Sequence, residues 1–483
     1  MSPRRSHLLP LLAVWCALCA FLPRLHAGFP GQDFDNPPPL PATPAPSAPA
    51  PAAETFGITT LTPPRLDTNP NPAYWPRMRL WQGVPSIERA PAGRLWATWY
   101  SGGIGEGKGH NYQLLVTSAD DGLTWSKPVA VFDPGRQLLG GAGSDAHLWL
   151  DPRGRLWWFI HRHMPAAPGI HPRTCWGFYT DTPDAPRPRW HGPLFAGYGY
   201  SLNKEFVTSD GEWLHLVDPM SRKTGGPPPA RKGAHVWKFA GYDRPFEHLG
   251  HIEIKDTPFT EHMLVERKNG GLWMLARARY GIAQAVSDDK GRTWRETAPF
   301  TSDFNINTRF YLGKLKSGSL LLIVNDHPKK RENLTAMLSD DDGETWPHKL
   351  VLDERGYVSY PDATQSPDGF IYAIHDRGRY QKDMQEILFA KITEADIRAG
   401  RLVTEGGFLK RKINKLADEG GGVHFDGESF GLTRQYEQLT GQKPREPEPG
   451  EKAEMPPAPA PPPPLTGPAG FQPAPPPSCP PPH

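Results

Sequence analysis

A glycine turn followed by an apolar strand recurs six times along this chain of 483 residues. Examples are "AGRLWATWY" early in the repeated region and "DGFIYAIHD" at its end. The turn glycines lie 47 to 61 residues apart: Gly93, Gly154, Gly211, Gly271, Gly318 and Gly369. Near-continuous apolar runs of this kind are typical of strands buried on both faces. Strand-rich units at this spacing predict blades arranged around an axis, so we expect an all-β, six-bladed β-propeller.

A second motif, S-x-D-x-G-x-T-W, occurs at residues 118–125, 287–294 and 339–346, with a degenerate copy at 180–190. Its Ser and Asp side chains can accept backbone N–H groups within a turn, and its Gly permits a positive φ. Its Trp can pack between strands. Each full copy follows a turn glycine by 16 to 25 residues. The motif therefore predicts the outer hairpin of a blade, with a structural role rather than ligand binding.

We expect the propeller to span residues 57–415. Ring closure is expected to use an early strand at 57–62, which would complete a late blade. One short helix is predicted at 393–400, because Thr393 is a suitable N-cap and Gly400 follows the helical segment. No segment between the repeated turns carries a sustained helical period, so helical repeats are disfavoured.

The ends of the sequence predict export and flexible segments. Residues 1–27 combine a basic start, an apolar run and a final small residue, the order of a secretory signal peptide. This order predicts a periplasmic or extracellular protein. Residues 28–56 form a Pro/Ala-rich linker, and residues 416–483 form a Pro-rich tail that we expect to be largely disordered.

The composition argues against several kinds of binding partner and structural framework. The net charge is +2 and no stripe of Lys or Arg stands out, which argues against nucleic acid. After signal removal no segment is long and apolar enough to span a membrane. Only 4 cysteines are present, two of them within the signal, so no disulfide framework is expected. We expect a monomer, and the 16 Trp suit either a strand-rich core or a carbohydrate site.

The octapeptide resembles the Asp-box, or BNR repeat. Several Asp-boxes on a six-bladed propeller resemble the sialidase (neuraminidase) superfamily, and the resemblance covers about residues 75–415. It implies an exported glycoside hydrolase of the exo-alpha-sialidase type, acting on terminal anionic sugars of glycans, so the expected partner is a glycan or oligosaccharide. In that superfamily three Arg hold the substrate carboxylate, a Tyr paired with a Glu is the nucleophile, and an Asp is the acid/base.

The resemblance assigns roles residue by residue. "VSYPDATQSPDG" places Tyr360 as the nucleophile, and "TEHMLVERKNGGLWMLARAR" places Glu261 as its partner. Arg277 and Arg309 match two arginines of the carboxylate grip, and Arg279 shares a strand face with Arg277. An Arg fork suits a carboxylate because it stays charged and binds both oxygens. The Glu is needed to take the phenol proton.

Two positions depart from the superfamily pattern. In "WQGVPSIERA", Gly83 stands where the first Arg of the grip would be. The stretch before the first octapeptide contains no Asp, and its acid/base candidates are Glu106 and His110. Asp145, which precedes the second repeated strand, is a further candidate. A carboxyl group or an imidazole can each act as a general acid near neutral pH.

Two other functions remain open from the sequence. One is a propeller hydrolase or lyase of uronic-acid polysaccharides that uses the same Tyr, His and Arg set, with larger roles for His262 and His110. The other is a catalytically silent carbohydrate-binding propeller, which the missing Arg and Asp would allow.

No cofactor is expected, and neither a phosphate-binding loop nor a nucleophile elbow is present in the sequence. His161 and His163 alternate on a predicted strand, and His147 and His171 lie in the same region. Without a clear set of carboxylate or Cys ligands beside them, no metal site is predicted.

Overall fold

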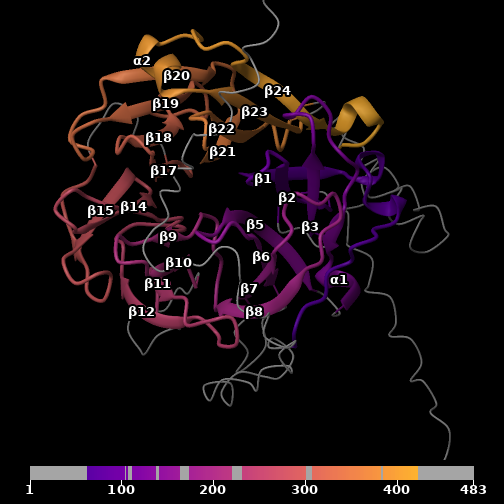
Figure 1. Cartoon of the computed structure of the whole chain (residues 1–483), viewed down its shortest axis with the longest axis horizontal. Helices are drawn as coiled ribbons and strands as arrows, with labels where there is room; N and C mark the ends of the chain where they lie inside the picture. Colours follow the sequence, from indigo (N-terminus) through magenta and orange to yellow (C-terminus); the bar gives the residue numbers. More distant parts are fainter. Residues whose placement is uncertain are drawn as a thin grey trace, which may run out of the picture. The chain divides into compact units, whose positions relative to one another are not determined.

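A computed structural model describes residues 62–103, 105–106, 111–137, 141–163, 173–219, 231–300, 307–381 and 384–422. Over these residues six four-stranded antiparallel sheets form a ring of blades (Figure 1). In each blade the four strands are consecutive in sequence, and the first lies next to the axis. The predicted six-bladed propeller is therefore confirmed.

The first half of the ring contains blades 1 to 3. Blade 1 consists of β1 (Trp81–Arg89), β2 (Leu95–Gly102), β3 (Tyr112–Ser118) and β4 (Ala130–Phe132). Blade 2 consists of β5 (Ala142–Leu150), β6 (Leu156–His163), β7 (Arg173–Thr180) and β8 (His191–Gly197). Blade 3 consists of β9 (Phe206–Val207), β10 (Trp213–Val217), β11 (Ala234–Lys238) and β12 (Glu247–Ile252).

The second half contains blades 4 to 6. Blade 4 consists of β13 (Met263–Glu266), β14 (Leu272–Ala278), β15 (Gly281–Ser287) and β16 (Arg295–Glu296). Blade 5 consists of β17 (Tyr311–Lys314), β18 (Leu320–Asn325), β19 (Leu334–Ser339) and β20 (His348–Asp353). Blade 6 consists of β21 (Val358–Gln365), β22 (Ile371–Arg377), β23 (Glu386–Ile392) and β24 (Phe408–Lys415).

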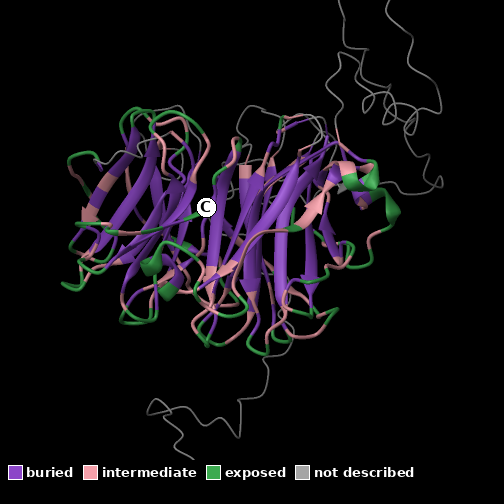
Figure 2. Cartoon of the chain, turned by 90° about the horizontal axis from the view of Figure 1, so that it is seen from above, coloured by how far each residue is buried: buried purple, intermediate pink, exposed green. Residues whose placement is uncertain are grey.

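The repeated glycine turn marks the second strand of every blade. Each of these strands begins one or two residues after its marker glycine, and β2, β14 and β18 are buried along their whole length. Five of the six markers adopt the positive φ that such a turn requires. Blade 4 differs by one position, because Gly270 (φ 80°) rather than Gly271 takes the left-handed conformation. Figure 2 shows buried strands with exposed residues gathered in the turns.

The hydrophobic core is divided among the blades. One apolar cluster fills each of the six gaps between neighbouring blades. Between blades 2 and 3, for example, Trp157 and Phe159 pack with Val217 and Trp237. A small seventh cluster lies near the axis. Burial is therefore shared around the ring, and each blade depends on both neighbours.

The Asp-boxes connect the third and fourth strands of blades 1, 4 and 5, as predicted. In the first, Ser118 Oγ accepts the N–H of Gly122, and Asp120 accepts both the N–H and the hydroxyl of Thr124. The same bonds recur in the other two copies. The Trp of each box packs on an apolar cluster between blades. The structural role predicted for the motif is confirmed.

The ring closes by side-chain contacts between blades 1 and 6. Asp362 accepts the Ser86 hydroxyl at 2.6 Å and the Ile87 N–H at 3.0 Å. Asp376 accepts the Val84 N–H at 2.8 Å. Blade 6 already has four consecutive strands, so it needs no early strand for completion. Residues 57–61, most of the segment expected to supply that strand, lie outside the described residues.

Helices are few in the described part of the chain. The predicted helix is confirmed as α2 (Glu394–Ala399), with Thr393 in a capping box and Gly400 left-handed at its end. The other short helices are η2 (Pro72–Tyr74), η3 (Pro76–Met78), α1 (Pro134–Gln137) and η4 (Leu416–Glu419). None of the helices described here is long and apolar enough to cross a membrane.

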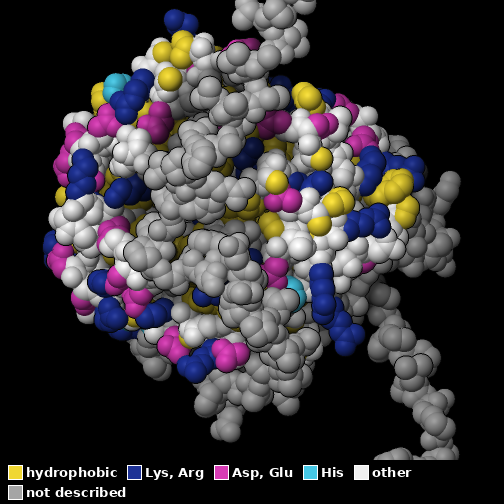
Figure 3. Space-filling view, in the orientation of Figure 1, with side chains coloured by type: hydrophobic (Ala, Val, Ile, Leu, Met, Phe, Trp, Pro, Cys, Tyr) yellow, Lys and Arg dark blue, Asp and Glu magenta, His cyan; other side chains and the backbone are white. Residues whose placement is uncertain are grey.

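The charged side chains on the described surface are mixed in sign. On the face shown in Figure 3, Lys and Arg alternate with Asp and Glu around the rim. No one-sign patch of the kind that binds nucleic acid stands out on the described part of this face.

Candidate functional site

Irregular backbone at the inner strands directs single side chains toward the axis. The pairing of β1, β5 and β21 with their neighbours shifts register at one point in each strand. These bulges hold Val84, Asp145 and Tyr360 at φ of 57°, 50° and 57°. Glu261, two residues before β13 begins, has a φ of 37°. Positive φ is costly for residues other than Gly, and such strain gathers where a side chain must be re-aimed.

Tyr360, Glu261 and Arg277 form one hydrogen-bonded cluster. Tyr360 Oη donates to Glu261 Oε1 at 3.2 Å. Arg277 Nη1 donates to both Glu261 oxygens at 3.0 Å and to Tyr360 Oη at 3.2 Å. All three side chains are buried. They come from blades 4 and 6, so tertiary folding unites residues that lie up to 99 positions apart.

The electrostatics of this cluster favour a protonated phenol beside a charged guanidinium. Burial and the nearby Glu261 raise the pKa of Tyr360 to about 12, although Arg379 and Arg277 act in the opposite direction. Burial alone would lower the pKa of Arg277, but Glu261 and Tyr360 outweigh it and raise that pKa. A phenol with so high a pKa needs a proton acceptor to react, and Glu261 is in contact with its hydroxyl.

Arg309 is joined to this cluster through Asn203. Arg309 Nε donates to Asn203 Oδ1 at 2.9 Å, and its Nη2 donates to the Leu202 carbonyl at 2.5 Å. Asn203 Nδ2 in turn donates to the carbonyls of Glu261 and His262 at 2.9 Å. Arg309 is 1% exposed, yet no carboxylate among the described residues forms an ion pair with it. A buried guanidinium held only by neutral oxygens favours an anionic ligand.

Arg379 occupies the space beside Gly83 and was missed by the sequence reasoning. A Cβ at Gly83 would overlap the Cδ and Cγ atoms of Arg379. The Arg379 guanidinium lies 4.1 Å from the ring centroid of Tyr360. It pairs with Asp376 at 3.3 Å and with Glu106 at 3.2 Å. The guanidinium absent at position 83 therefore has a counterpart from blade 6. In the sequence, Arg379 follows the end of β22, the second strand of blade 6, and Arg277 lies near the end of β14, the second strand of blade 4. This similar position was the signal that could have identified Arg379 as a site residue.

The two described acid/base candidates differ in their surroundings. Burial acts to raise the pKa of Glu106, but Arg379 and hydrogen bonds from Tyr100 and Tyr380 outweigh it and lower that pKa. Asp145 is partly buried, and burial with the charges of Glu106 and Glu261 raises its pKa to about 8. Of the two, Asp145 is the carboxyl that forms no ion pair with a basic group among the described residues.

Two of the described sequence candidates do not join the cluster. Arg279 has a side chain that is 61% exposed and pairs with Asp256 at 3.3 Å, so it does not face the axis with Arg277. His262 is buried, with its ring nitrogens against Thr260 Oγ1 and the carbonyl of His235. His110 lies outside the described residues.

One group outside the cluster has the donor atoms of a metal site. It consists of His147, Glu205 and His215, whose ligand atoms lie within 4.8 Å of one another. Of the four histidines considered from the sequence, only His147 belongs to this group, and His171 lies outside the described residues.

Comparison with known proteins identifies the type of propeller. Residues 210–373 match the family model of a BNR repeat-like domain. A Hadza microbial sialidase matches at 16% identity with a TM-score of 0.53, over 66% of each chain. A leech intramolecular trans-sialidase matches at 13% identity with a TM-score of 0.52, over 68% of this chain and 70% of that one.

An intramolecular trans-sialidase from Ruminococcus gnavus matches at 13% identity with a TM-score of 0.51, over 68% of this chain and 98% of the other. No curated protein sequence matches. At these identities the structural likeness shows the fold alone. The chain is thus a six-bladed β-propeller whose residues 210–373 match a BNR repeat-like domain and whose fold is similar to that of known sialidases.

Proposed function

We propose that this protein is a sialidase-like glycoside hydrolase that acts on terminal anionic sugars of glycans. The observation that carries the proposal is the contact of Tyr360 Oη with both Glu261 and Arg277 at the axis. A buried phenol that donates to a carboxylate is arranged for proton loss, and a neighbouring guanidinium stabilises the phenolate.

In the proposed reaction Tyr360 Oη attacks the anomeric carbon while Glu261 takes the phenol proton. The bond to the leaving group breaks, and Asp145 gives its proton to the departing oxygen. A glycosyl-tyrosine intermediate results, and water activated by Asp145 then attacks the anomeric carbon and releases the phenol oxygen, which regains its proton from Glu261. Asp145 is favoured over Glu106 because Glu106 is already paired with Arg379.

The substrate acid group is assigned to the arginines around Tyr360. Arg309 can offer a charge that no described carboxylate contacts as an ion pair. Arg277 and Arg379 border the same tyrosine and would complete a cationic pocket. A tyrosine nucleophile also suits an anionic sugar, because a neutral phenol is not repelled by the sugar carboxylate as a charged carboxylate nucleophile would be.

The test is an assay of the purified protein on a fluorogenic sialoside and on uronate oligosaccharides. We expect release of sialic acid, and we expect Tyr360→Phe to lower kcat/KM on the order of 10³-fold or more. Tyr372→Phe is the matched control, since this buried tyrosine of blade 6 bonds Asp121 on blade 1. The Tyr372→Phe variant should have the same kcat/KM as the wild type.

Other results of the same assay would contradict the proposal. A new absorbance from an unsaturated uronate would identify a lyase, and hydrolysis of uronate oligosaccharides alone would identify a uronate hydrolase. Binding of acidic glycans without turnover would leave a carbohydrate-binding propeller. Equal activity of Tyr360→Phe and wild type would remove Tyr360 from the chemistry.

We also propose that the protein is exported. Support comes from the signal-like order of residues 1–27, which lie outside the described residues. N-terminal sequencing of the protein recovered outside the cytoplasm should begin after residue 27. An intact N-terminus on protein found only in the cytoplasm would contradict export.

A further inference from the structure

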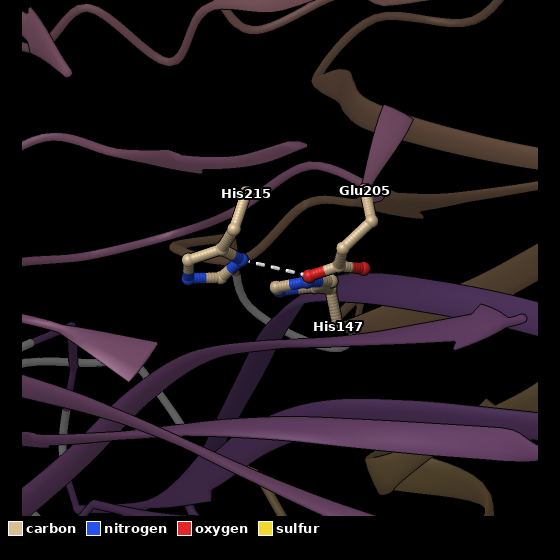
Figure 4. A group of neighbouring side chains, drawn as sticks. All are labelled: His147, Glu205 and His215. Carbon is tan, nitrogen blue, oxygen red and sulfur yellow. Dashed lines mark hydrogen bonds and ion pairs between the residues drawn. The ribbon is translucent and has the colours of Figure 1, made fainter. Parts of the chain in front are cut away.

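His147, Glu205 and His215 meet in the gap between blades 2 and 3 (Figure 4). His147 lies on β5, Glu205 immediately precedes β9, and His215 lies on β10. The two imidazoles face the same carboxylate oxygen of Glu205, His147 Nε2 at 3.1 Å and His215 Nδ1 at 2.8 Å. Both histidines have no exposed surface, and the side chain of Glu205 is 1% exposed.

The imidazoles of this group have too few N–H donors for the oxygen acceptors that they face. His147 Nδ1 faces the carbonyl of Ser201 at 2.9 Å, and its Nε2 faces Glu205. A neutral imidazole has one N–H, whereas a carbonyl and a carboxylate can only accept. One nitrogen of a neutral His147 therefore points its lone pair at an acceptor. The second oxygen of Glu205 is also buried and has no hydrogen-bond partner among the described residues.

A bound cation resolves the mismatch at His147. The Nδ1–H of His147 would then donate to the Ser201 carbonyl and leave Nε2 as a ligand, the arrangement that orients most metal-binding histidines. Metal bonds of about 2.0–2.2 Å place tetrahedral ligand atoms about 3.3 Å apart. The two contacts to Glu205, at 3.1 and 2.8 Å, are close to that separation. All three ligand atoms lie within 4.8 Å of one another, so the two imidazoles must approach each other when the ion binds.

The surroundings also fit a buried metal site. Phe159 stacks on both imidazoles, and its ring centroid lies 4.8 Å from that of His147 and 4.9 Å from that of His215. This apolar wall keeps water from the ligands. Cys175 Sγ lies 3.5 Å from His215 Nε2, where it can hold the ring through its outer nitrogen. His161 is not a ligand, since its two nitrogens face the Ser144 carbonyl and the Ser201 N–H.

We propose that His147, Glu205 and His215 bind one divalent transition-metal ion, of which Zn²⁺ is the probe, and that the ion joins blade 2 to blade 3. Two imidazoles and one carboxylate are a ligand set for Zn²⁺ and other first-row divalent metals. The site is separate from the Tyr360 cluster, so its test does not depend on glycosidase activity.

The first measurement is metal content by mass spectrometry on the full chain, purified without immobilised-metal resin. We expect close to one equivalent of a first-row transition metal per chain. A strong chelator should remove it and lower Tm by about 5 °C or more, and ZnCl₂ should restore Tm. A metal-free chain whose Tm responds to neither chelator nor ZnCl₂ would overturn the proposal and leave a buried imidazolium–carboxylate pair.

Variants locate the ion. Glu205→Gln and His215→Asn should each lose bound metal and the ZnCl₂ response of Tm. The matched control is His375→Asn, because His375 Nε2 lies 3.1 Å from Asp353 Oδ2 in an equally buried pair that belongs to no metal-type group among the described residues. The control should keep its metal. Wild-type metal content in both ligand variants would overturn the assignment, and if neither variant folds the wild-type measurements decide.

Discussion

At the scale of single residues, the strained backbone of Tyr360 allows its side chain to contact residues that are distant in sequence. Its left-handed φ of 57° is unfavourable for an aromatic residue, yet it brings the phenol beside Glu261 and Arg277. Sequence resemblance selected these three residues and Arg309, and the structure brings them together. Resemblance did not select Arg379, because that residue reaches Gly83 only when blade 6 packs on blade 1; its place just after the second strand of blade 6 was the only signal in the sequence.

Arg309 is the residue at which the proposed recognition of an acid group is best tested. Hydrogen bonds to charged groups contribute about 1.5–3 kcal/mol, so Arg309→Gln should raise KM about 10- to 100-fold for an anionic substrate. Arg279→Gln is the control, since that side chain is 61% exposed and lies away from the cluster. Steady-state kinetics on the sialoside measures both. The same KM in the two variants would argue against recognition by Arg309.

At the scale of the elements, the Asp-box is a turn that fastens a blade to its neighbour. The hairpin of blade 5 brings Gly343 against Trp273 of blade 4, where a Cβ would lie 2.5 Å from the ring. The hairpin of blade 1 brings Gly122 against Phe389 of blade 6, where a Cβ would lie still closer to the ring. These glycines meet two demands at once, a positive φ for the turn and contact between blades. The second demand was not visible in the local sequence.

Substitutions at Gly343 and Gly318 distinguish the need for a positive φ from the need for close contact between blades. Their φ values are 91° and 93°, but a Cβ at Gly318 meets nothing within 4 Å. Gly318→Ala should therefore lower the free energy of unfolding by about 1–2 kcal/mol through backbone strain alone. Gly343→Ala should lose about 1–3 kcal/mol more, because Trp273 is buried and cannot move aside. Chemical denaturation gives both values, and equal losses would show that contact between blades contributes nothing.

At the scale of the whole molecule, Lys204 ties several blades together near the axis. It lies in the segment that enters blade 3, and its Nζ donates to the carbonyls of Ile87 at 2.7 Å and Leu148 at 2.8 Å. It also pairs with Glu88 at 3.0 Å and Asp362 at 3.2 Å. Blades 1, 2 and 6 are thereby connected through one ammonium group. No local pattern in the sequence indicates this contact.

Removal of that ammonium group should destabilise the whole ring. Lys204→Met leaves two buried carboxylates without their partner, so we expect a loss of about 3–5 kcal/mol in the free energy of unfolding. Lys330→Met, at a side chain that is 69% exposed, should change it by less than about 0.5 kcal/mol. Urea denaturation at pH 7 compares the two. A small effect at Lys204 would show that its carboxylates find other partners.

The pH dependence of this contribution has a definite sign. Burial alone would lower the pKa of Lys204, but Asp362 and Glu88 outweigh it and raise that pKa. A raised pKa in the folded state gives stability that is fully present below the ordinary lysine pKa of about 10.4. The difference in stability between wild type and Lys204→Met should therefore stay constant through neutral pH and shrink only in strong alkali.

The sequence alone determined the blade count, the second strand of each blade, the Asp-box turns and the capped helix α2. Each of these depends on short-range patterns of apolar, glycine and capping residues, which act over a few positions of the chain. It also selected Tyr360, Glu261, Arg277 and Arg309 through resemblance. Tertiary structure alone decided that Arg379 fills the space at Gly83 and that Arg279 faces solvent.

Tertiary structure also decided which buried polar groups meet. Lys204 meets carboxylates more than a hundred positions away, and Glu205 meets His147 across 58 positions. No local pattern encodes such pairs, because their partners are set by how the blades pack. Once the apolar strands are buried, the polar groups carried with them must find partners in the gaps that remain.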